Sequence, residues 1–412
     1  MRILDVRITP IAFSDPPLLN AVGVHEPFVH RVIIEIDVEG GVLGLGECAG
    51  GAERLRNLEV GAAAVKGMNV FETSKMEAAI AAALAENESA FELGAVFSAF
   101  EVACLDAQGH ITGQSVCDLL GGRVRNDVPF SAYLFYKWAE HPALDGRPAI
   151  TDQWGEALDP AGIVGQARKM IAEYGFKSIK LKGGVFPPAQ EIEAIRELRK
   201  TFPDMPLRLD PNTAWSVETS RWVAEQTAGL LEYLEDPTPG LEGMAEVAAL
   251  SAMPLATNMC VVAFDQIKRS VELDSVQVIL GDHHYWGGLR HTRELGAICE
   301  TFGIGMSMHS NSHLGISLAA MVHVAAATPA LTYACDTHYP WNGHNDVIKP
   351  GALAFTDGNV RVPEGPGLGV ELDRDKLAEL HRQYLETNRG SRDDTGYMQK
   401  IVPGFSADFP RW

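Results

Sequence analysis

The sequence predicts an α/β protein, a (β/α) barrel of the TIM type that carries an α+β capping domain. Apolar runs of strand length alternate with helical patterns from residue 128 to residue 350, which is typical of a parallel sheet. Six polar residues close successive runs at intervals of 23 to 28 residues, about the length of one strand-plus-helix unit. Catalytic groups of a barrel lie at the C-terminal ends of its strands, so we expect these six at one face. They are Lys182, Asp210, Glu235, Asn258, Asp282 and His309.

Residues 1–127 are predicted to form the capping domain. Residues 1–13 and 31–47 alternate as strands do, and the second run contains a Gly-Gly hairpin signal. The proline-rich stretch 14–28 between them is long for a turn, and ordered loops of that length often cover active sites. Residues 52–121 are alanine-rich with apolar residues at helical spacing. Strands followed by helices, without alternation, indicate a separate α+β domain.

Residues 128–350 are predicted to form the barrel, with an insertion at 139–160 after the first strand. The eight expected strands are 128–136, 178–182, 206–210, 231–236, 254–258, 276–282, 304–309 and 331–338. The expected helices are 163–175, 189–202, 217–229, 242–252, 289–303 and 315–328. No helix is assigned between the strands 254–258 and 276–282. The remaining segment, 351–412, contains short strands at 352–363 and a helix at 373–388, and we expect it to pack back on the capping domain.

Composition narrows the function classes. The formal net charge is −20, so nucleic acid and anionic membrane surfaces are poor partners. A small anionic substrate is compatible with this charge, because a metal and a few local cations can reverse the field in one pocket. No apolar run approaches the ~20 residues that span a bilayer, and the first residues do not resemble a signal peptide. Six scattered cysteines without CxxC pairs suggest free thiols in a reducing compartment. We therefore expect a cytoplasmic protein that acts on a small molecule.

Lys180 and Lys182 lie two residues apart on one short strand, so both side chains point to the same face. Two ammonium groups in one cleft depress each other's pKa, which would help one act as a base. The alternative is a surface strand with two solvated lysines. The apolar neighbours Ile179 and Leu181 make that alternative less attractive.

Asp210, Glu235 and Asn258 end three consecutive strands. Three oxygen ligands with room for water suit Mg²⁺. Each residue alone could equally cap the following helix or open a turn, but three at barrel spacing favour a metal site.

His309 ends the strand that follows Asp282. A carboxylate beside a histidine fixes its tautomer and makes it a general acid or base. A lone histidine is more often structural, and the partner on the adjacent strand favours function. With Lys182 and a divalent cation, the pair suits abstraction of a proton next to a carboxylate.

The chain resembles the enolase superfamily, and within it the glucarate dehydratase subgroup, nearly from end to end. The subgroup's asparagine as third metal ligand matches Asn258, whereas the mandelate racemase subgroup would carry an acidic residue there. Asp282 argues against the muconate-lactonising type, which would place a lysine on that strand. The matching stretches are LLNAVGVHEPFVHR, FKSIKLKGGV, LDPNTAW, LEDP, ATNM, SMHSNSHLGISLAA, DTH, GLGVEL and SRDDTGYMQKIVPG.

The resemblance implies a role for each matching residue. Asp210, Glu235 and Asn258 would bind Mg²⁺; the two bases would be Lys182 and His309. Asp282 would orient His309, and Lys180 would lie beside the substrate carboxylate. The implied substrate contacts are His25, Ser98, Tyr133, Ser310, Asn311, His338 and Arg392, with Asn20 as a further candidate. Arg392 is suited to the distal carboxylate of a diacid.

The implied activity is Mg²⁺-dependent dehydration of a hexarate such as D-glucarate by a homo-oligomer. Ser98 stands where the family pattern has threonine, and the insertion 139–160 is unusual, so specificity could differ. The alternatives are dehydration of another acid sugar, for example galactarate, and racemisation with the same parts. A non-catalytic relative ranks lowest, because every catalytic residue type is present.

Overall fold

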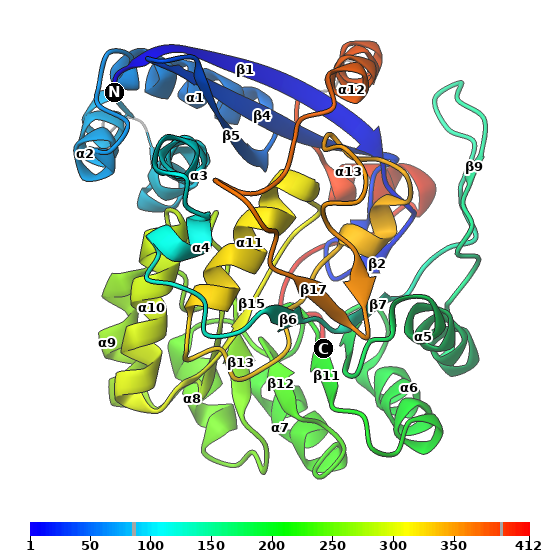
Figure 1. Cartoon of the computed structure of the whole chain (residues 1–412). Helices are drawn as coiled ribbons and strands as arrows, with labels where there is room; N and C mark the ends of the chain where they lie inside the picture. Colours follow the sequence, from blue (N-terminus) through cyan, green and yellow to red (C-terminus); the bar gives the residue numbers. More distant parts are fainter. Residues whose placement is uncertain (85–87, 388–389) are drawn as a thin grey trace.

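The computed structural model describes residues 1–84, 88–387 and 390–412. Residues 85–87, within the predicted helical section, and residue 388, the end of the predicted C-terminal helix, lie outside the described residues. A capping domain of strands and helices lies beside a parallel sheet surrounded by helices (Figure 1). The predicted fold class is confirmed.

The capping domain is a three-stranded antiparallel sheet packed against helices, and the sheet order is β1-β4-β5. Helix α3 lies very close to β5: a Cβ atom at Gly44 would be 2.0 Å from the carbonyl oxygen of Ala103, so only glycine fits there. Ser89 caps the start of α3 by accepting from the backbone N–H of Glu92. The elements are β1 (Ile3–Ser14), β4 (Phe28–Val38), β5 (Val42–Ala49), α1 (Ala52–Val65), α2 (Thr73–Leu84), α3 (Ala90–Thr112) and α4 (Val116–Leu119).

The barrel contains a seven-stranded parallel sheet in the order β15-β14-β13-β12-β11-β10-β7. Lys182 pairs with Asp210 at the C-terminal ends of neighbouring strands, which brings polar groups to one edge. The strands are β7 (Ala132–Phe135), β10 (Ile179–Lys182), β11 (Leu207–Asp210), β12 (Tyr233–Glu235), β13 (Leu255–Thr257), β14 (Val278–Gly281) and β15 (Gly305–Met308).

Among the residues that the structure describes, seven helices surround this sheet, one more than predicted. The unpredicted helix is α9, a ten-residue helix in which only Ile267 and Ser270 are buried. Helix α11 is buried along its whole length and lies between the barrel strands and the capping domain (Figure 1). The helices are α5 (Pro160–Tyr174), α6 (Pro188–Thr201), α7 (Val217–Gln226), α8 (Leu241–Ala248), α9 (Phe264–Leu273), α10 (Leu289–Phe302) and α11 (Gly315–Ala327).

The prediction of a regular eighth strand at 331–338 is wrong. Residues 331–338, all of them described, make only two isolated bridges, one to Met306 and one to Phe130. The backbone N–H of Cys335 donates to Pro129 (2.8 Å), and proline has no N–H with which to continue a ladder. This segment nevertheless closes the ring, since it hydrogen-bonds to β15 on one side and to the start of the barrel on the other.

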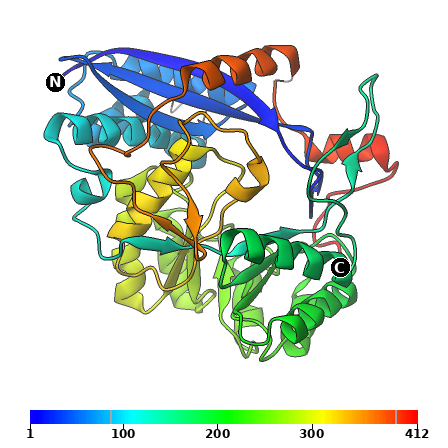
Figure 2. The same cartoon turned by 45° about the vertical axis from the view of Figure 1, so that its right-hand side comes forward.

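The C-terminal segment contacts both domains (Figure 2). Its hairpin, β16 (Phe355–Thr356) and β17 (Asn359–Arg361), pairs with β6 (Asp127–Pro129) at the entry to the barrel. Helix α12 (Arg374–Thr387) packs on β1 of the capping domain. The domain boundaries stay a prediction, because the hairpin joins the barrel side and the helix joins the capping side.

Stretch 14–28, the end of the chain and the insertion each form short elements. Stretch 14–28 contains the hairpin β2 (Leu19–Asn20) and β3 (Gly23–Val24), and α13 (Asp394–Ile401) packs on β3. The insertion forms a second hairpin, β8 (Glu140–His141) and β9 (Ile150–Thr151).

All six cysteines are free. None of the described helices is long and apolar enough to cross a membrane.

Candidate active site

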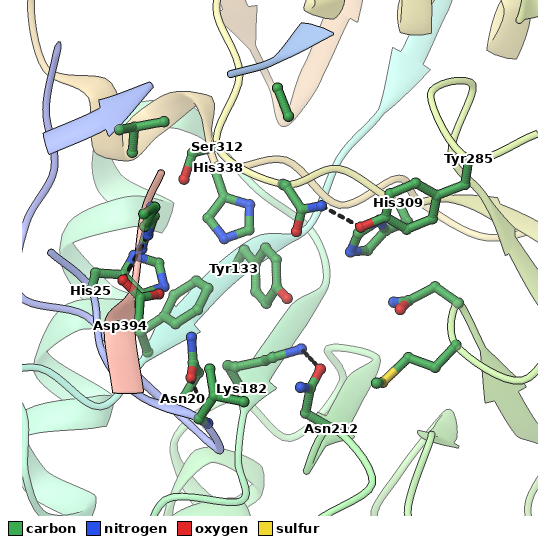
Figure 3. A pocket seen from close by; sticks show the side chains of 18 of the residues that line it. Asn20, His25, Tyr133, Lys182, Asn212, Tyr285, His309, Ser312, His338 and Asp394 are labelled. Atoms are coloured by element: carbon green, nitrogen blue, oxygen red, sulfur yellow. Dashed lines mark hydrogen bonds and ion pairs between the residues drawn. The ribbon is translucent and has the colours of Figure 1, made fainter. Parts of the chain in front are cut away.

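A cavity of about 630 Å³ opens at the C-terminal ends of the barrel strands, beneath stretch 14–28 and the segment before α13. Figure 3 shows its lining side chains pointing inward from both domains. Nine of the predicted site residues line it: Asn20, His25, Tyr133, Lys182, Asn258, His309, Asn311, His338 and Arg392.

The other predicted residues do not line this cavity. Lys180, Asp210, Glu235, Asp282 and Ser310 are buried, and their contacts place them next to lining residues. Ser98 is also fully buried, in the middle of α3, and is not part of the lining. The prediction that Ser98 contacts the substrate is therefore not supported by its position.

His309 and Asp282 form a buried pair. The Nδ1 atom of His309 lies 3.0 Å from Oδ2 of Asp282. Burial raises the pKa of Asp282, but His284 and His309 outweigh burial and bring it well below its usual value. An ionised Asp282 accepts a hydrogen bond from Nδ1–H of His309, which directs the lone pair of the imidazole to Nε2. That nitrogen can act as a base, since His309 lines the cavity.

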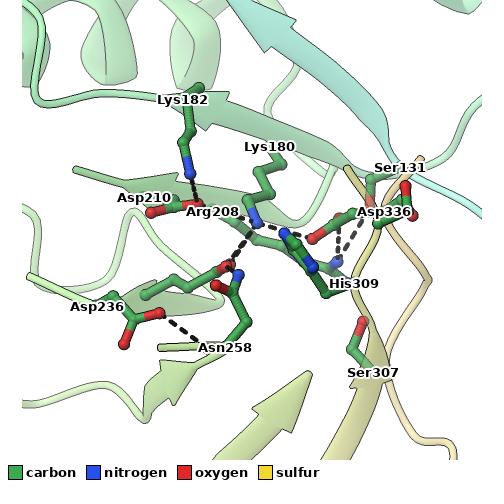
Figure 4. A network of polar contacts seen from close by, with 12 residues as sticks. Ser131, Lys180, Lys182, Arg208, Asp210, Asp236, Asn258, Ser307, His309 and Asp336 are labelled. Atoms are coloured by element: carbon green, nitrogen blue, oxygen red, sulfur yellow. Dashed lines mark hydrogen bonds and ion pairs between the residues drawn. The ribbon is translucent and has the colours of Figure 1, made fainter. Parts of the chain in front are cut away.

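Both lysines are surrounded by oxygen atoms (Figure 4). Lys182 donates to Oδ2 of Asp210 (2.7 Å) and to Oδ1 of Asn212 (2.8 Å). Lys180 is fully buried and lies 2.6 Å from Glu235, 2.8 Å from Asp336 and 3.2 Å from Asp210. Lys180 lies buried beneath the cavity, whereas Lys182 lines it. That Lys180 lies beside the substrate carboxylate stays a prediction.

The expected lowering of the lysine pKa values is wrong for this arrangement. Burial lowers the pKa of Lys182, but Asp210 and other negative groups outweigh both burial and Lys180, so its pKa is raised. The pKa of Lys180 is also raised, because Asp336 and Glu235 outweigh burial. Attraction to the carboxylates therefore exceeds repulsion between the two ammonium groups.

The residues predicted to bind a metal form a compact set of oxygen donors. The amide of Asn258 contacts Oε1 of Glu235 (2.6 Å), and both Asp210 and Glu235 lie beside Lys180. Burial and the charge of Asp210 raise the pKa of Glu235 well above its usual value. Negative charge is crowded here, and a hard divalent cation with oxygen ligands would relieve it. The donor set therefore fits Mg²⁺.

Three backbone positions that follow Asp210 and Glu235 have left-handed φ angles. Asn212 and Thr213 have φ angles of 56° and 61°, and Asp236 has 37°. Left-handed backbone is uncommon for a β-branched residue and often marks functional sites. At Asn212 it accompanies the hydrogen bond from Lys182. Asp236 accepts from the backbone N–H of Asn258 (2.8 Å) and so fixes that ligand.

The distal end of the cavity is built from segments far apart in the chain. Asp15 accepts from Nδ1 of His25 (2.8 Å) and from the guanidinium of Arg392 (3.0 Å). Arg392 also donates to Asp394 (2.7 Å). The loop that precedes β4 and the segment that precedes α13 are thereby joined over the cavity.

His338 lines the cavity between His309 and the distal end that contains His25 (Figure 3). Its Nδ1 donates to the carbonyl oxygen of Ser310 (2.9 Å), and burial lowers its pKa well below the usual value. A neutral His338 therefore presents Nε2 as an acceptor. Ser310 acts on the site through this bond and is not itself part of the cavity lining.

Glu191 of α6 fixes the loop that follows Lys182. Its carboxylate accepts from the backbone N–H groups of Gly184 (3.0 Å), Val185 (2.9 Å) and Phe186 (3.0 Å). Burial raises the pKa of Glu191 to about 7. Because this pKa exceeds that of a glutamate in the unfolded chain, the contribution of Glu191 to stability is greatest below the unfolded pKa. That contribution is lost as pH rises through about 7.

The variant Glu191→Gln should be less stable than the parent at pH 5, by about 1–3 kcal/mol, because the amide NH₂ faces backbone N–H groups and cannot accept from them as an oxygen of the protonated carboxyl can. The parent loses stability towards pH 8 and the variant lacks that titration, so the difference should shrink. Thermal unfolding midpoints at both pH values test this. A difference that grows with pH would contradict it.

Several residues of the site were not predicted: Asn212, Asp236, His284, Tyr285, Asp336 and Asp394. Four of them had a signal in the sequence, since each lies two residues from a predicted one: Asn212 after Asp210, His284 after Asp282, Asp336 before His338, and Asp394 after Arg392. Tyr285 lies with its ring 5.6 Å from that of His309. Only the tertiary structure shows this contact.

Comparison with known proteins places the chain in a family. Residues 162–376 match the family described as enolase C-terminal domain-like, and residues 5–121 match the N-terminal domain of mandelate racemase / muconate lactonizing enzyme. The chain belongs to the enolase superfamily. A relative in this superfamily, a probable glucarate dehydratase from Streptomyces coelicolor, is 49% identical over 100% of this chain and 99% of its own length.

Solved structures of the superfamily agree closely with this fold. An enolase from Thermobispora bispora, complexed with magnesium and formate, is 55% identical with a TM-score of 0.97 and full coverage of both chains. An enolase from Pseudomonas fluorescens with bound magnesium, potassium and tartrate is 50% identical, with a TM-score of 0.96 over 100% of this chain and 99% of that one.

Proposed function

We propose that this enzyme is a Mg²⁺-dependent hydro-lyase that dehydrates an acid sugar with two carboxylates, with D-glucarate as the leading substrate. The observation that carries the proposal is one cavity lined by His309, Lys182 and Asn258. The buried carboxylates bonded to these three lie directly behind them: Asp282 behind His309, Asp210 behind Lys182 and Glu235 behind Asn258. His309 and Lys182 approach this cavity from different strands (Figure 3).

Asp210, Glu235 and Asn258 would hold the cation, which two of the similar solved structures contain as magnesium. When bound, Mg²⁺ would supply positive charge that stabilises the negative charge developing on the substrate carboxylate. Lys180 keeps Asp210 and Glu235 in place from below.

The proton step belongs to His309. Nε2 of the neutral imidazole removes the proton from the carbon next to the carboxylate, and Asp282 stabilises the imidazolium that forms. The hydroxyl group on the neighbouring carbon leaves as water with the proton that the His309 imidazolium gives back, and the remaining enol tautomerises to a keto group. Lys182 would perform the proton removal for a substrate of opposite configuration.

The distal groups of the cavity support a diacid. Arg392 can offer a further N–H group to a carboxylate in addition to its bonds to Asp15 and Asp394. His25 and His338 line the same cavity as hydrogen-bonding groups for hydroxyls. Tartrate, bound in the Pseudomonas fluorescens structure, is itself a hydroxylated diacid. The 49% identity to a probable glucarate dehydratase makes D-glucarate the first compound to test.

A library of acid sugars, assayed for keto-acid product with Mg²⁺ present, tests the proposal. We expect turnover of at least one hexarate, with D-glucarate above galactarate and above monoacids. Absence of turnover for every diacid sugar would contradict it. Exchange of the α-proton with solvent deuterium, without loss of water, would instead indicate a racemase.

A further inference from the structure

Asp282 is shared between two imidazoles. Its Oδ2 contacts Nδ1 of His309 (3.0 Å), while its Oδ1 contacts both the backbone N–H (2.9 Å) and Nδ1 (2.8 Å) of His284. Asp282 is 1% exposed, so these three donors rather than water share its charge. His284 is therefore bonded to the carboxylate that orients the base.

The second ring nitrogen of His284 fixes its tautomer. Nε2 lies 3.3 Å from a guanidinium nitrogen of Arg31 and 3.1 Å from the hydroxyl of Ser317. A guanidinium group can only donate, so Nε2 must accept. His284 is then neutral, with its proton on Nδ1, and donates that proton's hydrogen bond to Asp282.

Arg31 links this arrangement to the capping domain. Its Nε donates to Glu47 (2.8 Å) in the neighbouring strand β5. Glu47 in turn accepts from the backbone N–H groups of Leu314 (2.8 Å) and Ser317 (2.9 Å) at the start of α11. A buried chain of hydrogen bonds thus connects the capping sheet with His309.

The same residues could suggest a metal centre, because Asp282, His283 and His284 offer ligand atoms close together. Both carboxylate oxygens of Asp282 and both ring nitrogens of His284 already have protein partners. This grouping is therefore better explained as an orienting network.

We propose that His284 is a positioning residue that sets the pH at which His309 can accept a proton. The proposal rests on the function proposed above for His309. Two N–H donors compete for the charge of one carboxylate, so the bond from His284 weakens the pull of Asp282 on the His309 proton. Loss of that donor concentrates the charge on His309 and makes its imidazolium harder to deprotonate.

The surroundings of the pair contain further charged and titratable groups, and a substitution at His284 leaves all of them in place. They are Arg31 on β4, Glu47 on β5, Lys182 on β10, His283 and Tyr285 after β14, His313 after β15, and His338 before the 3-10 helix Tyr339–Asn342. Differences between variants at position 284 therefore report on the hydrogen bond to Asp282.

Two substitutions separate the two ends of the His284 ring. The amide of His284→Asn takes the place of Nδ1 and can still donate to Asp282. The longer amide of His284→Gln takes the place of Nε2, so it retains the contact with Arg31 and Ser317 but not the donor to Asp282. Each variant thus keeps the hydrogen bonds of one end of the ring and loses those of the other, and only His284→Gln loses the donor to Asp282.

The test is the NMR titration of the His309 ring in uniformly labelled, Mg²⁺-loaded protein, with the signal assigned by its absence in His309→Asn. We expect the midpoint in His284→Gln to rise by about one pH unit and the midpoint in His284→Asn to stay within about 0.3 unit of the parent. The acidic limb of the pH profile of kcat/KM should shift by the same amount as the midpoint, and kcat/KM at high pH should fall little.

Equal midpoints in His284→Gln and the parent, or equal shifts in both variants, would overturn the proposal. If His284→Gln does not fold, Ser317→Ala should move the midpoint in the same direction by a smaller amount, and no movement would count against the proposal. The NMR arm needs no turnover. The NMR result therefore tests the role of His284 even if no acid sugar is a substrate. Absence of a substrate would contradict only the proposed function.

Discussion

Replacement of His309 by asparagine should lower kcat on the best hexarate by about 10³-fold, the usual scale for loss of a general base. The asparagine amide can take the place of Nδ1 and donate to Asp282, so the packing is expected to survive. No lone pair remains where Nε2 faced the cavity, and the α-proton then has no acceptor on that side. Steady-state kinetics and the thermal unfolding midpoint measure the two effects separately.

The matched control is His344→Asn, the same chemical change at an exposed residue that does not line the cavity. It should retain the parent's kinetics. Activity of His309→Asn within tenfold of the parent would show that another group removes the proton. Wash-in of solvent deuterium catalysed by the variant would point to Lys182 as that group.

The barrel could be predicted because its strands are short apolar runs that end in polar residues, as β10 to β15 do. The failures have local physical causes. Residues 331–338 alternate like a strand, but their pairing partner Pro129 lacks an N–H. Helix α9 is the exception, because its apolar residues Phe264, Ile267 and Val271 do follow helical spacing.

The site could be predicted where it depends on strand ends, and not where it depends on tertiary contacts. Asp282 and His309 were paired from their positions on consecutive strands, and the structure places them 3.0 Å apart. The bond between Asp15 and Arg392 joins residues 377 positions apart, a separation that no local pattern can show. Ser98 was selected by its match to a family position, yet the helix directs it into the protein interior.

Removal of Mg²⁺ by a chelator should abolish turnover, and Glu235→Gln should lose at least about a hundredfold in activity or in apparent Mg²⁺ affinity. Glu235 is fully buried and contacts both Lys180 and Asn258, so its carboxylate is central to the donor set. An amide keeps the shape but not the charge that attracts the cation.

The parent should gain thermal stability when Mg²⁺ is added, because a ligand that binds only the folded state stabilises it. Glu235→Gln should gain almost nothing over the same range. The control Glu242→Gln makes the same change at an exposed side chain of α8 and should behave as the parent does. Chelated parent enzyme that still turns over a hexarate would contradict the metal requirement. An equal stability gain in the Glu235→Gln variant would place the cation elsewhere, since the crowded negative charge of Asp210 and Glu235 is the physical reason for locating it here.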